Sequence, residues 1–157
     1  MSNPRLAAQE ILDKYWNKSF PVDAVRIARD MGIIVRSIPP HESDLSGRYE
    51  PAKMGQPATI YVNLSDSYYR QRFTVAHELG HHVLHGESNF RDPVHQPPGV
   101  FPAEIEANNF AAAILMPEYH IRRYFDGGIS TEKLCKTFGV SKSALGWRLM
   151  NLGYRYD

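Results

Sequence analysis

Four of the seven histidines in this chain of 157 residues fall between positions 77 and 85. Two of them enclose a glutamate in the sequence HELGH at positions 77–81, which has the form H-E-x-x-H. Side chains at positions i and i+4 lie one turn apart on one face of a helix, so both imidazoles can reach one metal ion. Glu78 follows His77 by about 100° around the helix axis and would flank that ion. The motif therefore predicts a zinc-binding helix in which Glu78 is the catalytic base.

The residues around the motif favour metal binding over a simpler interpretation. On a helical wheel, the apolar side chains gather opposite His77, and the polar side chains share its arc. The alternative is a solvated, histidine-rich surface, which a single histidine would favour. Two histidines at ligand spacing with a glutamate between them favour a metal site instead. We therefore expect His77 and His81 to be ligands.

A catalytic zinc ion usually takes three protein ligands and a water. His85 lies two turns beyond His77, a rise of about 12 Å, which is too far for both to share one ion. The next predicted helix offers Glu104 and Glu106, which lie about 200° apart around its axis, so only one can face the metal. Glu104 lies beside Asn108 within an apolar face, where a polar pair is costly unless it is used.

We expect Glu104 to be the third ligand, with Asn108 as its polar partner. Two alternatives stay open. Glu104 could serve only to stabilise the first turn of its helix, because an acid there interacts favourably with the helix dipole. Glu106 is the reserve ligand.

The remaining patterns predict an α+β fold. Apolar spacing, caps and breakers predict helices at 4–18, about 21–31, 67–85, 102–116, 131–138 and 142–152. Strands are expected at 33–35, 45–50 and 59–62, and an irregular loop at 86–100. Because the connections between 45 and 62 are too short for a helical crossover, the small sheet of about three strands is expected to be antiparallel.

Composition excludes several classes of protein. The length suits one domain, which we divide into a core at 1–128 and a helical tail at 129–157. A net charge of +1 favours neither nucleic acid nor an acidic membrane as a general partner. The single cysteine excludes a disulfide scaffold. The first residues lack an apolar signal core, and no apolar run is long enough to span a membrane, so a cytoplasmic location is expected.

Two motifs together resemble the ImmA/IrrE family of metallopeptidases. They are the sequences at 72–81 and 84–85, followed by those at 104–108 and 110–117, and the resemblance covers roughly residues 45–152. It implies a minimal thermolysin-like core of the gluzincin type, with one zinc ion on His77, His81 and Glu104. It also implies that Glu78 is the base and that the substrate is a helix-turn-helix transcription repressor. The short chain is most similar to the form carried by mobile elements and prophages.

The expected reaction is hydrolysis of a peptide bond within the chain of the substrate. Zinc would lower the pKa of a bound water to about 7, and Glu78 would accept its proton and pass it to the leaving amine. His85, Tyr61 and the loop at 86–100 are candidates for stabilising the oxyanion, although each of them could be purely structural. The strand at 59–62 could bind an extended substrate as an edge strand, or it could be an ordinary strand of the core.

The tail carries a helix-turn-helix-like pattern with a glycine at the turn, Gly139. Five basic residues against two acidic ones between 129 and 157 form only a small positive excess. A recognition helix would offer Lys142, Trp147 and Arg148 to DNA. We favour a helical pair that packs on the peptidase. The alternative function is a non-proteolytic regulator that docks to a repressor, or to DNA through this tail.

Overall fold

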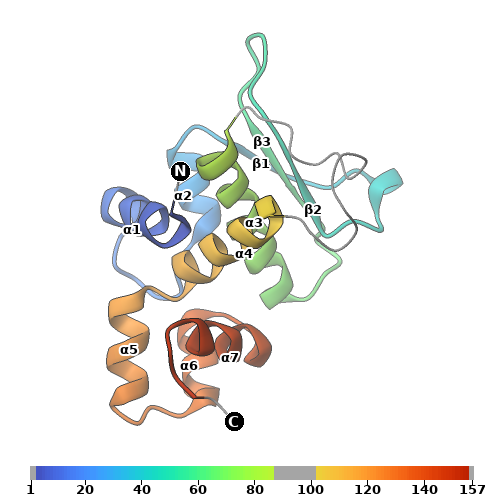
Figure 1. The fold of residues 1–157 in the computed structure, drawn as a ribbon. Coiled ribbons are helices and arrows are strands. Elements are labelled where there is room, and N and C mark those ends of the chain that lie inside the picture. The colour runs from blue at the N-terminus through green and yellow to red at the C-terminus, as the bar shows by residue number, and fades with distance from the viewer. Residues whose placement is uncertain (1–2, 87–101, 156–157) are drawn as a thin grey trace.

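A computed structural model describes residues 3–86 and 102–155, and its fold is α+β (Figure 1). Within these residues the chain forms seven α-helices, three strands and a short 3-10 helix at Pro40–Glu42. The helices are α1 (Pro4–Tyr15), α2 (Ala24–Asp30), α3 (Tyr68–His85), α4 (Pro102–Leu115), α5 (Glu118–Asp126), α6 (Thr131–Phe138) and α7 (Lys142–Asn151). The strands are β1 (Ile34–Ser37), β2 (Gly47–Glu50) and β3 (Thr59–Val62). No helix among the described residues combines the length and the apolar character needed to cross a membrane.

Short polar side chains fix where several helices begin. The side chain of Ser67 accepts a hydrogen bond from the backbone of Arg70 at the start of α3. Ser130 and Ser141 cap α6 and α7 in the same way, as predicted. Each cap satisfies a backbone N–H that has no partner within its helix. The sequence analysis assigns no element to residues 118–126, and in the structure they form α5 directly after Pro117.

The sheet is mixed, so the prediction of an antiparallel sheet is wrong in part. Its strand order is β1–β3–β2, and β2 pairs antiparallel with β3 as the short connection between them requires. β1 pairs parallel with β3. Between these two strands the chain runs back along β2, so β3 begins at the same end of the sheet as β1. β3 is therefore the central strand. Of the two alternatives for residues 59–62, the strand of the core is the one found, and β2 and β1 are the edges.

Helix α3 lies at the centre of the molecule, between the sheet and the remaining helices (Figure 1). Its most extensive packing is against α4, where Gly80 permits close approach because a Cβ there would lie 3.2 Å from the Ala107 carbonyl oxygen. The sheet packs equally tightly at Gly47. A Cβ at that position would lie 2.4 Å from Thr74 Cγ2 and 2.6 Å from the Tyr61 carbonyl oxygen. These contacts hold α3 firmly between β2 and α4.

The substitution Gly47→Ala is expected to destabilise the protein by about 1–3 kcal/mol, because its methyl group overlaps backbone that cannot move independently. Thermal unfolding of the two proteins measures the difference. Gly127→Ala is the matched control, since residue 127 has an ordinary φ of −77° and its nearest neighbour would lie 3.1 Å away. Equal stability of Gly47→Ala and the parent would show that β2 does not need this close approach.

The tail is joined to the rest of the chain by two arginines. Arg72 of α3 donates hydrogen bonds to the carbonyls of Val22, Phe138 and Gly139. Arg148 of α7 is only 3% exposed, and its Nε and Nη2 both donate to the Met116 carbonyl at the end of α4. Arg148 is therefore not available to DNA, which corrects its place among the candidate DNA-contacting residues. The division of the chain into a core at 1–128 and a tail at 129–157 stays a prediction.

Candidate metal centre

Helix α3 brings two imidazoles to one carboxylate from α4. His77 Nε2 lies 3.1 Å from Glu104 Oε2, and His81 Nε2 lies 2.6 Å from Glu104 Oε1. One ligand atom from each of these three residues lies within 4.8 Å of the other two. In the described part of the chain this is the group of histidine and carboxylate side chains that could hold a metal ion. Two imidazole nitrogens and a carboxylate oxygen form a ligand set that suits catalytic zinc.

The surroundings keep Glu104 in its charged form. Hydrogen bonds with His77 and then with His81 hold the pKa of this carboxyl well below its ordinary value of 4.5, although partial burial acts in the opposite direction. A carboxylate must be ionised to bind a metal. The carboxylate is therefore ready to act as a ligand.

Asn108 lies one turn beyond Glu104 on α4, and its contact is with the first histidine. Its Oδ1 lies 2.8 Å from His77 Nδ1. Because an amide oxygen only accepts hydrogen bonds, this contact favours a proton on Nδ1 and turns the Nε2 edge of the ring toward Glu104, where Nε2 would offer its lone pair to a bound ion. The structure therefore places Asn108 against His77, and its role as the polar partner of Glu104 stays a prediction.

His85 and Glu106 form a second line of contacts behind His81. His85 Nδ1 lies 3.0 Å from His81 Nδ1, and His85 Nε2 lies 2.9 Å from Glu106 Oε1. Glu106, the reserve ligand in the sequence analysis, is not in the three-residue cluster. His85, a candidate for the oxyanion, contacts a predicted ligand and a carboxylate. This arrangement can orient His81.

Glu78 is on the stripe of α3 that faces the edge strand. Thr74, Glu78 and His82 follow one another by four residues, and all three approach β2. A Cβ at Gly47 would lie 3.7 Å from Glu78 Oε2, and the Tyr49 hydroxyl lies 2.7 Å from His82 Nδ1. Glu78 itself is 4% exposed. Glu78 therefore lies between β2 and the face of α3 that carries His77 and His81.

Tyr61 lies on the other face of the sheet. Successive residues of a strand point to opposite faces, and Tyr61 pairs with Arg48, next to the residue that contacts α3. The Arg48 guanidinium lies 4.0 Å from the centre of the Tyr61 ring and is held by Glu42 and Glu50. Tyr61 is thus part of a cluster that faces away from α3. The candidate loop at 86–100 falls, beyond Gly86, outside the described residues.

This arrangement can be compared with known proteins. The model of the peptidase M78 family, described as the IrrE N-terminal-like domain, matches residues 28–150. The chain belongs to the ImmA/IrrE family. This match confirms the resemblance given by its motifs.

Two curated relatives share parts of the chain. The radiation response metalloprotease IrrE of Deinococcus radiodurans is 38% identical over 96 residues, which cover 54% of this chain and 28% of that protein. Immunity region protein 2 of Bacillus phage phi105, which is uncharacterised, is 28% identical over 100 residues, covering 62% of this chain and 61% of the phage protein. The chain thus matches less than two thirds of either relative.

The sequence analysis missed a set of residues that extends the same helix faces. Arg70 and Phe73 precede His77 by about two turns and one turn on α3, and with Asn108 they line a cavity that also includes Trp147. Phe73 lies about 40° from His77 around the helix axis, so the placing of the apolar side chains opposite His77 is wrong for Phe73. Trp147 lies far along the chain, and only the fold brings it to this surface.

Proposed function

We propose that this protein is a zinc-dependent endopeptidase. The observation that carries the proposal is the cluster of His77, His81 and Glu104, with the buried carboxyl of Glu78 on the neighbouring stripe of the same helix. Such a ligand set leaves a position for water and substrate. The family supports peptidase chemistry, and the residues support the kind of metal.

In this proposal each side chain has one task. His77, His81 and Glu104 hold the ion, which when bound acts as a Lewis acid and lowers the pKa of a water. Asn108 and His85 orient the two histidines. Glu78 accepts a proton from the attacking water and then donates it to the leaving amine. Its burial limits exchange of that proton with solvent.

We further propose that the substrate binds as an extended segment along β2. This strand is an edge of the sheet, and Gly47 places its backbone against Thr74 and beside Glu78. Unpaired backbone groups at a sheet edge can bind an added strand. A substrate strand on β2 would therefore pass the stripe of α3 that carries the base. This assignment replaces the strand at 59–62.

The proposed substrate is a helix-turn-helix transcription repressor. The resemblance to short ImmA/IrrE proteins implies this substrate, and the match to a phage immunity region protein agrees with such a setting. The test expresses the protein and its Glu78→Gln variant in a bacterial host that carries the native neighbouring genes, and maps new protein N-termini by mass spectrometry. A new terminus in a repressor that is absent with the variant is the expected result. Identical profiles from the two proteins would contradict the proposal.

Removal of the His85 ring is expected to weaken zinc binding by about 10–100-fold, because outer contacts fix the orientation of a ligand histidine. Competition with a chelator of known affinity measures the change in His85→Ala. His82→Ala is the matched control, since its ring contacts Tyr49 in place of a ligand. Equal zinc affinity of His85→Ala and the parent would remove His85 from the metal centre.

A further inference from the structure

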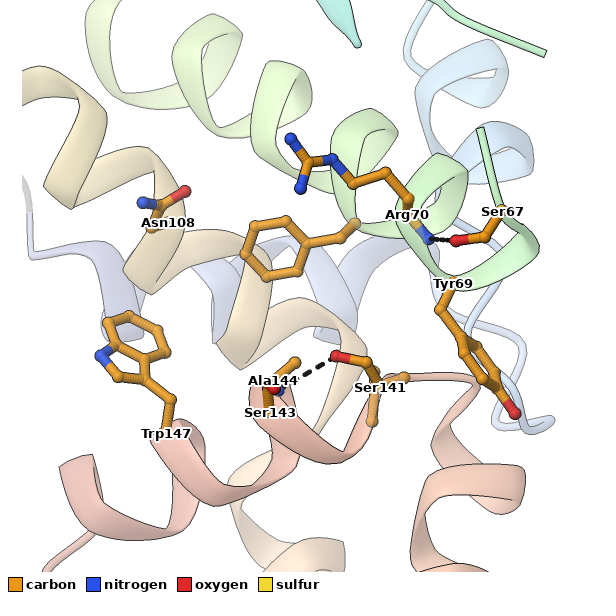
Figure 2. Close-up of a pocket in the computed structure, with 10 residues that line it drawn as sticks. Ser67, Tyr69, Arg70, Asn108, Ser141, Ser143, Ala144 and Trp147 are labelled. Atoms are coloured by element: carbon orange, nitrogen blue, oxygen red, sulfur yellow. Dashed lines mark hydrogen bonds between the residues drawn. The ribbon is translucent and has the colours of Figure 1, made fainter. Parts of the chain in front are cut away.

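A cavity of about 460 Å³ lies between α3, α4 and α7. Figure 2 shows Trp147 reaching from α7 and Asn108 from α4 toward the same space, while Arg70 extends along the α3 side. Phe73, Val140 and Ala144 supply apolar parts of the wall. A cavity of this size accommodates one or two side chains of a peptide.

The cavity adjoins the candidate metal centre. Asn108 belongs to both, since it lines the cavity and its Oδ1 contacts His77 Nδ1. Phe73 lies one turn before His77 on α3, and Asn108 lies one turn after Glu104 on α4. A substrate whose backbone passes the metal centre would therefore reach the cavity with its next side chains.

The polar groups in the wall favour a negative ligand. Arg70 is exposed, and within the part of the chain that the structure describes its guanidinium makes no hydrogen bond or ion pair. Among the described residues, those that line the cavity include no aspartate or glutamate. Asn108, Trp147 and Ser143, which also line the cavity, are residues that carry hydrogen-bond donors. A single cation with apolar walls suits a carboxylate attached to an apolar segment better than the regular phosphates of DNA.

We propose that this cavity is a substrate subsite for an acidic peptide segment. An apolar side chain lies between Phe73 and Trp147, and a neighbouring aspartate or glutamate pairs with Arg70. The inference rests on the proposed function, because the ligand is part of the substrate, and it adds selectivity for acidic sequences next to the cleaved bond.

The test measures binding without cleavage. The chain has two tryptophans, and Trp16 is buried, so Trp16→Phe leaves Trp147 as a fluorescent reporter in the cavity wall. The protein is the zinc-loaded full chain with Trp16→Phe and Glu78→Gln. The first pair of probes is acetyl-Gly-Leu-Glu-Gly-amide and acetyl-Gly-Leu-Gln-Gly-amide. A second pair reverses the two central residues, to Glu-Leu and Gln-Leu. Of the two glutamate peptides, we expect the one that binds more tightly to have an affinity about 5–10-fold higher than that of the glutamine peptide with the same residue order. A charge-assisted hydrogen bond at a partly exposed site would give a difference of this size.

Arg70→Gln should remove this preference, and Lys142→Gln should keep it. Lys142 is the matched control, because it is an exposed cation at the start of α7 that does not line the cavity. Absence of peptide binding, equal binding of both peptides, or a preference that survives Arg70→Gln would overturn the inference. So would a DNA duplex that quenches Trp147 and resists competition by the acidic peptide. Because binding is read without cleavage, a negative N-terminus map would count against the peptidase alone, and an absent acidic preference against the subsite alone.

Discussion

The variant Glu78→Gln is expected to cleave its substrate about 10²–10⁴-fold more slowly than the parent while it retains one zinc ion per chain. Glutamine has nearly the same size as glutamate but cannot accept the proton of the attacking water. The metal ligands are His77, His81 and Glu104 in our proposal, so the substitution leaves the ion in place. Elemental analysis measures zinc content, and cleavage of the mapped substrate measures the rate.

Glu10→Gln is the control for this experiment, because it makes the same chemical change at an exposed position of α1. It should cleave at the parental rate. If Glu78→Gln retained full activity, another group would have to be the base. If the variant lost both zinc and activity, Glu78 would instead support the metal centre structurally, and thermal unfolding would separate that outcome from a folding defect.

Arg148→Ala is expected to destabilise the protein by about 2–4 kcal/mol, which corresponds to a fall in Tm of roughly 5–15 °C for a chain of this size. The guanidinium is buried and donates twice to the Met116 carbonyl, so alanine leaves both a cavity and a buried carbonyl without these donors. Burial also lowers the pKa of Arg148 to about 10, which reflects the cost of holding its charge away from water.

Arg148→Met should cost less than Arg148→Ala, because methionine refills the space and removes the buried charge together with its hydrogen bonds. Chemical denaturation of the two variants gives the comparison. Lys142→Ala on the same helix is the exposed control and should change stability by less than about 0.5 kcal/mol. Parental stability of Arg148→Ala would show that the tail is not anchored at Met116. The same data matter for any test of DNA binding, since weaker binding of an unfolded variant would be uninformative.

Local periodicity was enough to predict that His77, His81 and Glu104 lie together, and it was not enough to predict the contacts around them. His77 and His81 share a helix face by spacing alone, and the apolar setting of Glu104 indicated which carboxylate would face them. A helical wheel gives directions without distances, so the contact from Asn108 to His77 and the line from His81 through His85 to Glu106 were not foreseen.

Features that depend on contacts between residues far apart in the sequence were harder to predict. The order β1–β3–β2 follows from how the chain returns after β2, and no pattern within the strand at 59–62 shows that it has a neighbour on each side. The sequence patterns predict Pro117 as the end of one helix and give no sign of α5, although proline also suits the start of a helix. The cavity needs Trp147 beside Phe73, and these residues meet only in the folded molecule.

The cavity is lined by residues from two parts of the chain that have different proposed roles. The proposed ligand residues and the proposed base lie on α3 and α4, whereas Ser143 and Trp147 come from α7. A change in α7 can therefore reshape one wall without touching a metal ligand, provided that Arg148 keeps its anchor on Met116. Descendants of such a chain could keep one hydrolytic apparatus while their last helix diverges to follow a changing target.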